Sequence, residues 1–198
     1  MQPVLDAVRA ANAVGDFLPQ TRLDDALEAC WDLSFDEVAR LYALPEPLCR
    51  AWATAAAKLE VTEPLDPYSD VNVLWTLPLR FFLVTTGYQR LQESKIGALG
   101  FRTRFEAVYV DALDESPRLG KEGLFRQVLT EHRLAATDVA VLGDSAESEL
   151  AAGQRIGLWT IQILREGVPA APNAHWRIRD LSELPAVLAQ IWPVAATT

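Results

Sequence analysis

Residues 139–163 constrain the fold of this chain more than any other stretch. An apolar run over residues 139–142 ends at a Gly-Asp-Ser sequence, a helical stretch follows, and a second apolar run covers residues 158–163. This order predicts a strand, a loop, a helix and a second strand parallel to the first. Asp144 follows the first strand directly, and open α/β sheets bind ligands at the carboxyl ends of their strands. The loop that begins at Asp144 is therefore a candidate binding site.

Two acidic residues of this loop make it a candidate metal site. Asp144 is followed by Glu149 five residues later. Carboxylate oxygens suit Mg²⁺, which is commonly held by one or two carboxylates together with several waters. A structural interpretation is also open, in which Asp144 and Ser145 only cap the helix that follows.

The chain changes character at Pro64–Pro67. Before this point apolar residues recur at helical spacing, and the alternation typical of strands is absent. Ser34, with Glu37 three residues later, matches a capping box at a helix start. We therefore predict a small all-helical unit over residues 1–66.

After Pro67, short apolar runs alternate with longer helical stretches. Such alternation predicts an α/β core over residues 67–198, with a three-layer, Rossmann-like arrangement in which helices cover both faces of a parallel sheet. The expected strands cover residues 80–85, 105–110, 139–142, 159–163 and 175–178, and the expected helices cover residues 88–99, 121–132 and 181–192.

The composition limits the partners and the compartment. The chain of 198 residues carries a formal net charge of −9 without a block of Lys and Arg, which argues against nucleic-acid binding. No apolar run is long enough to span a membrane, and the N-terminus does not match a secretory signal. Cys30 and Cys49 form no CxxC pair, so they indicate thiols in a reducing compartment. We expect a cytoplasmic protein.

Polar residues at three positions are expected to meet at one edge of the sheet. Thr85 ends the strand at residues 80–85, Lys121 begins a helix, and Asp144 with Glu149 follows the third strand. The hydroxyl can donate a hydrogen bond to a phosphate, the ammonium can neutralise phosphate charge, and the carboxylates can hold Mg²⁺. Taken singly, Thr85 is equally an ordinary strand-end threonine and Lys121 an ordinary solvated lysine.

The joint order of these residues resembles the haloacid dehalogenase-like (HAD) hydrolase superfamily, from about Tyr68 to Trp192. Thr85 matches the family's second motif and Lys121 its third, and both would contact phosphate. Asp144 and Glu149 match the fourth motif, which would hold Mg²⁺. The resemblance implies a phosphatase-like hydrolase that acts on a phosphorylated small molecule. The helical residues 10–63 are similar to the helical cap that these proteins insert.

The family's first motif, a strand ending in Asp-x-Asp-x-Thr, has no match in this sequence. Its first Asp is the nucleophile that forms an aspartyl-phosphate, and its second is the general acid/base. Asp6 has Val8 where the second Asp belongs, and Asp32 has Ser34 there. Both stand in helical surroundings, so neither makes the motif and the nucleophile stays unassigned.

Three hypotheses about function remain open. The first is a HAD-like homologue without the nucleophile motif, catalytically impaired and acting on a phosphate ligand or a protein partner. The second is a genuine Mg²⁺-dependent phosphatase whose first strand is absent from this chain. The third is a structural or assembly protein on a HAD-like scaffold.

The family places its first-motif strand in mid-sheet, between the strands matched here by residues 80–85 and 139–142. We predict that these two strands pair directly, because an unpaired interior edge would leave backbone groups without partners. An open edge also invites another chain, so the gap is a motive for a homo-oligomer.

Overall fold

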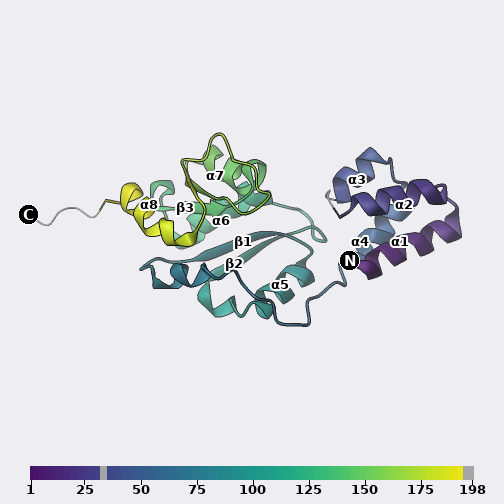
Figure 1. The fold of residues 1–198 in the computed structure, drawn as a ribbon, viewed down its shortest axis with the longest axis horizontal. Helices are drawn as coiled ribbons and strands as arrows, with labels where there is room; N and C mark the ends of the chain where they lie inside the picture. Colours follow the sequence, from purple (N-terminus) through teal and green to yellow (C-terminus); the bar gives the residue numbers. More distant parts are fainter. Residues whose placement is uncertain (32–34, 194–198) are drawn as a thin grey trace, which may run out of the picture.

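The computed structural model describes residues 1–31 and 35–193, and within them four helices come first (Figure 1). Their apolar residues recur on one face, and prolines occupy the first turn of two of them, where a missing N–H costs nothing. Asp16 follows the first helix as its C-cap, with a left-handed backbone at φ 47°. The helices are α1 (Gln2–Gly15), α2 (Gln20–Ala29), α3 (Phe35–Leu41) and α4 (Glu46–Ala56).

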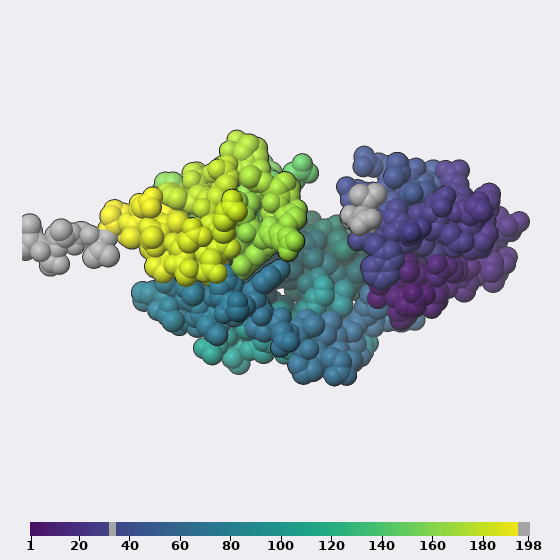
Figure 2. All heavy atoms as spheres, viewed as in Figure 1, coloured from purple at the N-terminus to yellow at the C-terminus, as the bar shows by residue number. Residues whose placement is uncertain are grey.

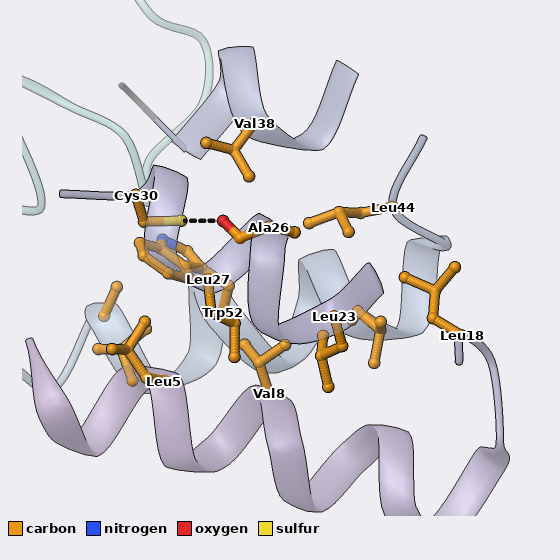
Figure 3. Packing of buried hydrophobic residues seen from close by; sticks show 13 residues of the cluster. Leu5, Val8, Leu18, Leu23, Ala26, Leu27, Cys30, Val38, Leu44 and Trp52 are labelled. Carbon is orange, nitrogen blue, oxygen red and sulfur yellow. Dashed lines mark hydrogen bonds between the residues drawn. The ribbon is translucent and has the colours of Figure 1, made fainter. Parts of the chain in front are cut away.

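These helices pack around a hydrophobic core of their own (Figure 3). Leu23 and Leu48 are fully buried in it, and the Trp52 ring stacks on Phe35 with centroids 4.1 Å apart. No described residue before Pro64 lies in a strand, in agreement with the predicted helical N-terminal region. The predicted cap at Ser34 and the candidate Asp32 lie outside the described residues.

The rest of the described chain alternates strands and helices, and every strand pairing is parallel. Figure 1 shows α5 below the strands and α6 and α7 above them. The predicted α/β class with a parallel arrangement and helices on both faces is confirmed. The strands are β1 (Phe82–Gly87), β2 (Ala107–Ala112), β3 (Ala140–Gly143), β4 (Trp159–Ile163) and β5 (Trp176–Ile178). The helices are α5 (Gln89–Ala98), α6 (Gly120–His132), α7 (Ala151–Arg155) and α8 (Leu184–Ile191).

The strands form two sheets, so the predicted direct pairing of residues 80–85 with 139–142 is wrong. One sheet has the order β1-β2 and the other the order β3-β4-β5. The inner strands β1 and β3 both line one cavity of about 530 Å³. Phe125 and Val128 of α6 line the same cavity, and α6 also packs on β1, β2 and α7. Apolar side chains of α6 therefore lie at the gap between β1 and β3.

The helical residues and the α/β residues touch directly at Tyr88 and through the segment that joins them. Tyr88 packs on the helical core, and Glu60 forms an ion pair of 2.5 Å with Arg90 of α5. The backbone N–H of Val61 donates to Ser94 Oγ at 2.8 Å. Figure 2 shows the helical residues, in purple and blue, at one side of the molecule and the C-terminal residues, in yellow, at the other. None of the helices described here combines the length and the apolar character needed to cross a bilayer.

Candidate functional site

Lys121 lies at the start of α6, beside the middle of β1. Its Nζ donates a hydrogen bond of 2.9 Å to the Val84 carbonyl. Burial lowers the pKa of Lys121 below its ordinary value. The carboxylates of Glu149, Asp111 and Asp144 oppose this shift, because their negative charges favour the ammonium. A half-buried cation therefore lies among carboxylates that come from the ends of β2 and β3.

Asp111, near the carboxyl end of β2, holds the loop that leads into α6 and Lys121. It is 4% exposed, and it accepts hydrogen bonds from Arg118 Nη2 at 2.5 Å and from the Gly120 N–H at 3.0 Å. Gly120 has φ 65°, a backbone that glycine adopts without steric cost. Burial acts to raise the pKa of Asp111, but the bonds from Arg118 and Gly120 and the nearby positive charges outweigh it, so this pKa lies below its usual range.

Sequence reasoning missed Asp111, although a signal was present. Like Asp144, it is an acidic residue directly at the end of an apolar run. Its role depends on Arg118 and Gly120, which come from the loop that leads into α6. No motif spacing indicates that this loop folds back onto the end of β2.

Glu149 shapes the loop after β3. Its Oε1 accepts hydrogen bonds from the backbone N–H groups of Asp144 at 3.0 Å and of Ser145 at 2.8 Å. A Cβ atom at Gly143 would overlap the Glu149 side chain, so the glycine leaves room for this contact. Ser145 caps the next helical turn through a bond from the Ser148 N–H. The structural interpretation of the loop therefore holds for Ser145, while the Asp144 side chain is exposed.

A buried glutamine of β4 is hydrogen-bonded to the same loop. Gln162 is fully buried, and its Nε2 donates to the Asp144 carbonyl at 3.0 Å and to the Pro169 carbonyl at 2.9 Å. Its Oε1 accepts from the Ala171 N–H at 2.7 Å. Gln162 is a polar residue inside the apolar run 158–163, and this was a signal that the sequence analysis did not use. A buried amide is normally hydrogen-bonded, so its presence in a strand indicates a polar partner nearby.

Thr85 lies on β1 next to Val84, but its hydroxyl is not directed to the same partners. Thr85 Oγ1 donates to Gln92 Oε1 of α5 at 3.2 Å. The structure thus brings Lys121, Asp144 and Glu149 into one electrostatic neighbourhood. Thr85 does not end its strand as predicted, because β1 continues to Gly87, and its hydroxyl is bonded to α5.

The described carboxylates are not grouped as a complete set of metal ligands. Among residues 1–31 and 35–193, no three acidic, histidine or cysteine side chains are grouped to hold a metal ion. One oxygen of Glu149 already accepts two backbone N–H groups. Asp144 and the second Glu149 oxygen fit Mg²⁺ only as the one or two protein ligands that this ion accepts beside water and phosphate.

Comparison with solved structures identifies the fold. A HAD phosphatase from Thermococcus onnurineus superposes with a TM-score of 0.62 over 93% of this chain and 87% of its own length, at 16% sequence identity. A HAD hydrolase from Bacillus subtilis, bound to magnesium, superposes with a TM-score of 0.56 over 94% of this chain and 92% of its own length, at 18% identity. The fold is that of the HAD-like hydrolases.

Sequence comparison finds distant relatives among known phosphatases. The chain is 28% identical to human N-acylneuraminate-9-phosphatase over 119 residues, which are 57% of this chain and 47% of that enzyme. The mouse enzyme is 25% identical over the same extent. The chain therefore matches about half the length of these curated relatives. No protein-family model matches it.

Asp6 does not lie on a strand of the HAD-like fold. It belongs to α1, where it is exposed, accepts a hydrogen bond of 2.8 Å from Gln2 and pairs with Arg9 at 3.4 Å. The family's nucleophile lies at the end of a strand, at the edge of the sheet. Asp6 lies in a helix instead, so it cannot take the place of the first-motif Asp.

Proposed function

We propose that this chain is a HAD-like phosphohydrolase homologue that binds a phosphorylated small molecule and is impaired in hydrolysis. One observation carries the proposal: Lys121 lies at the strand ends among Asp111, Asp144 and Glu149. The three carboxylates, together with the cations Lys121 and Arg118, carry one net negative charge. A bound Mg²⁺ would change this to one net positive charge. That balance suits a phosphate group, which carries one to two negative charges near neutral pH.

Each group has a distinct part in this proposal. Lys121 neutralises phosphate charge as a point cation, and Asp111 acts through Arg118 and Gly120 to hold Lys121 in place. Thr85 donates its hydroxyl to phosphate once released from Gln92. Asp144 and Glu149 would hold Mg²⁺, which supplies charge screening for the phosphoryl group. We place these roles in a core over residues 67–198, with residues 1–66 as a cap-like unit, in a cytoplasmic protein.

The impairment follows from the missing nucleophile. Charge stabilisation alone leaves the bond to phosphorus without an attacking group, and a carboxylate nucleophile is what the family uses. The sequence contains no Asp-x-Asp pattern, and the described residues place no strand between β1 and β3. The open position also favours the second hypothesis, a working phosphatase that gains this strand from outside residues 1–198.

Hydrolysis of p-nitrophenyl phosphate by residues 1–198 with Mg²⁺ is expected to stay at the level of buffer, because no carboxylate is positioned to attack phosphorus. A steady-state assay of released nitrophenol measures it. The Lys121→Met variant is the control, since activity that survives this change comes from a contaminant. Turnover that disappears in Asp6→Asn or in Asp32→Asn would contradict the proposal and identify the nucleophile.

Mg²⁺ alone is expected to bind more weakly than micromolar, because two carboxylates, one of them bonded to the backbone, offer few oxygens. Inorganic phosphate added with Mg²⁺ should bind about 10- to 100-fold more tightly to the native chain than to Lys121→Met, as expected for one charged hydrogen bond of about 1.5–3 kcal/mol. Calorimetric titration measures both constants.

The exposed Lys58 supplies a matched control for the phosphate titration, because Lys58→Met removes the same charge from the linker after α4. Equal phosphate affinity in the native chain and in Lys121→Met would contradict the proposed site. Micromolar Mg²⁺ affinity that Asp144→Asn leaves unchanged would show that other residues hold the metal.

A further inference from the structure

A cavity of about 340 Å³ follows the outer edge of β2. Within the described part of the chain β2 pairs with β1 alone, so its other edge carries no strand. Successive residues of β2 from Val108 to Ala112 line the cavity, together with residues of α5 and α6. Because these helices lie on opposite faces of the strands (Figure 1), the cavity lies between two helix layers, beside an open strand edge.

The backbone of β2 presents donors and acceptors to this cavity. The Leu113 N–H, at the end of β2, donates to a carbonyl of β1. Alternate residues of a strand direct their backbone groups to opposite sides, so Ala112, Val110 and Val108 face away from β1. The Ala112 carbonyl agrees, because it accepts the Glu115 N–H at 3.3 Å and not a group of β1. The cavity therefore exposes the groups that an added strand would pair with.

Two charged side chains of the cavity lining have no partner in the described part of the chain. Arg118 is paired with Asp111, and the two glutamines of the lining donate to glutamates four residues later. Arg102, before β2, and Glu115, after it, are exposed, and neither side chain has an ion pair or hydrogen bond within residues 1–31 and 35–193. An unpaired cation thus lies at the amino end of β2 and an unpaired carboxylate at its carboxyl end.

The two faces of the cavity differ in polarity. Leu119, which is 55% exposed, and Leu124 line it at α6, whereas Gln89 and Glu93 line it at α5. The Tyr109 side chain bonds to α6, so its neighbours along β2 direct their side chains to α5. A strand added at this edge would place alternate side chains against leucines and against polar groups.

We propose that the cavity binds a free peptide of about four residues, which adds a strand antiparallel to β2 with its carboxylate at Arg102 and its ammonium at Glu115. Main-chain hydrogen bonds to Val108 and Val110 would supply affinity. The two faces of the cavity would select a peptide that alternates apolar and polar residues.

The two unpaired charges set the direction and the length of the peptide. A parallel peptide would bring its ammonium to Arg102 and its carboxylate to Glu115, so that like charges would meet at both ends. From Val108 to Ala112 β2 rises about 13 Å, at about 3.3 Å for each residue, and four residues of an added strand cover this length. A single amino acid covers one such step and cannot reach both charges.

A second copy of this chain fits the cavity less well. Its own β2 is flanked by α5 on one face and by α6 on the other, and both helices already line this cavity. A single extended peptide brings no helix layer with it, so it can lie between α5 and α6.

Calorimetric titration of the full chain with the tetrapeptide Thr-Val-Thr-Leu tests the proposal. It measures no catalysis and leaves Lys121 unchanged, so its outcome is independent of the proposed function. Saturable binding is expected. The same peptide with an acetylated amino end and an amidated carboxyl end should bind about 3- to 20-fold more weakly, as expected for the loss of two exposed ion pairs.

Methylation of single peptide nitrogens tests the pairing with β2. Polar side chains that face α5 lie on the residues whose backbone groups face β2, because hydrogen-bonded partners direct their side chains to one face. N-methylation of the second Thr should therefore weaken binding about 5-fold or more. N-methylation of Val is the matched control and should leave the affinity unchanged, because this N–H faces solvent.

Two variants of the chain locate the ends of the peptide. Arg102→Gln should weaken binding of the free peptide about 2- to 5-fold and leave the amidated peptide unchanged, and Glu115→Gln should do the same with the acetylated peptide. Arg104→Gln is the control for the first variant, since Arg104 lies over the Trp75 ring and outside the cavity lining.

Hydrogen exchange of the native chain locates the bound strand directly. Saturating peptide should slow exchange at the amides of Val108 and Val110, which face the cavity, and leave the Tyr109 amide, which faces β1, unchanged. Absence of saturable binding, equal affinity for the peptide with blocked ends, or unchanged exchange at Val108 and Val110 would overturn the proposal. Sedimentation that shows a dimer with these amides already protected would also overturn it, in favour of a second copy.

Discussion

Trp52→Ala is expected to destabilise the helical N-terminal region by about 3–5 kcal/mol, the usual cost of truncating a buried aromatic side chain to alanine. Trp52 is 6% exposed, belongs to the hydrophobic core of α1–α4 and stacks on Phe35 (Figure 3). A cavity of this size cannot close easily, because the surrounding leucines come from several helices. The loss is a large fraction of the stability of a small unit.

Hydrogen exchange at the amides of α1, α2 and α4 measures this effect where it arises, since a signal from the whole chain would average the helical and α/β regions. Trp31→Ala is the matched control, because Trp31 is 65% exposed and its removal is expected to change stability by less than about 0.5 kcal/mol. Equal effects of the two substitutions would contradict the packing of α1–α4 described above.

Asp111→Ala is expected to lower the free energy of unfolding of the α/β region by about 0.5–1.5 kcal/mol, the net contribution of a typical hydrogen bond, because it leaves the half-buried Gly120 N–H without its acceptor. Loss of the Arg118 pair adds little, since the Arg118 side chain is 41% exposed and water replaces the carboxylate. Urea unfolding at neutral pH measures the difference. Glu115→Ala, an exposed acid of the same loop, is the control and should be nearly neutral.

The pH dependence of this difference has a defined sign. The pKa of Asp111 is lowered in the folded chain, so its ionised form contributes stability above the pKa of the unfolded chain, about 3.9. This contribution is lost as the pH falls through the lower folded pKa. The stability gap between native and Asp111→Ala chains should therefore narrow in acid. A gap that widens there would contradict the assigned hydrogen bonds.

The sequence by itself determined the order and type of the elements. Helical spacing of apolar residues before Pro64 and short apolar runs after Pro67 are local patterns, and local patterns decide which face of an element is buried. The boundaries were less accurate: β1 covers Phe82–Gly87, two residues later than expected. The position of Asp144 after β3 also followed from a local signal. The apolar run ends at Gly143, so the residue that follows it lies at the edge of the sheet.

Only the tertiary structure decided how these elements meet. The separation of β1 from β3 is seen only in the order of the two sheets, and α6 packs on the strands of one sheet and on α7. The roles of Asp111 and Gln162 depend on loops that return to them from seven residues away or more. Contacts between residues distant in sequence depend on how whole elements pack, and no periodicity records that packing. The gap between β1 and β3 is such a property, because each of these strands taken alone has the sequence pattern of an ordinary paired strand.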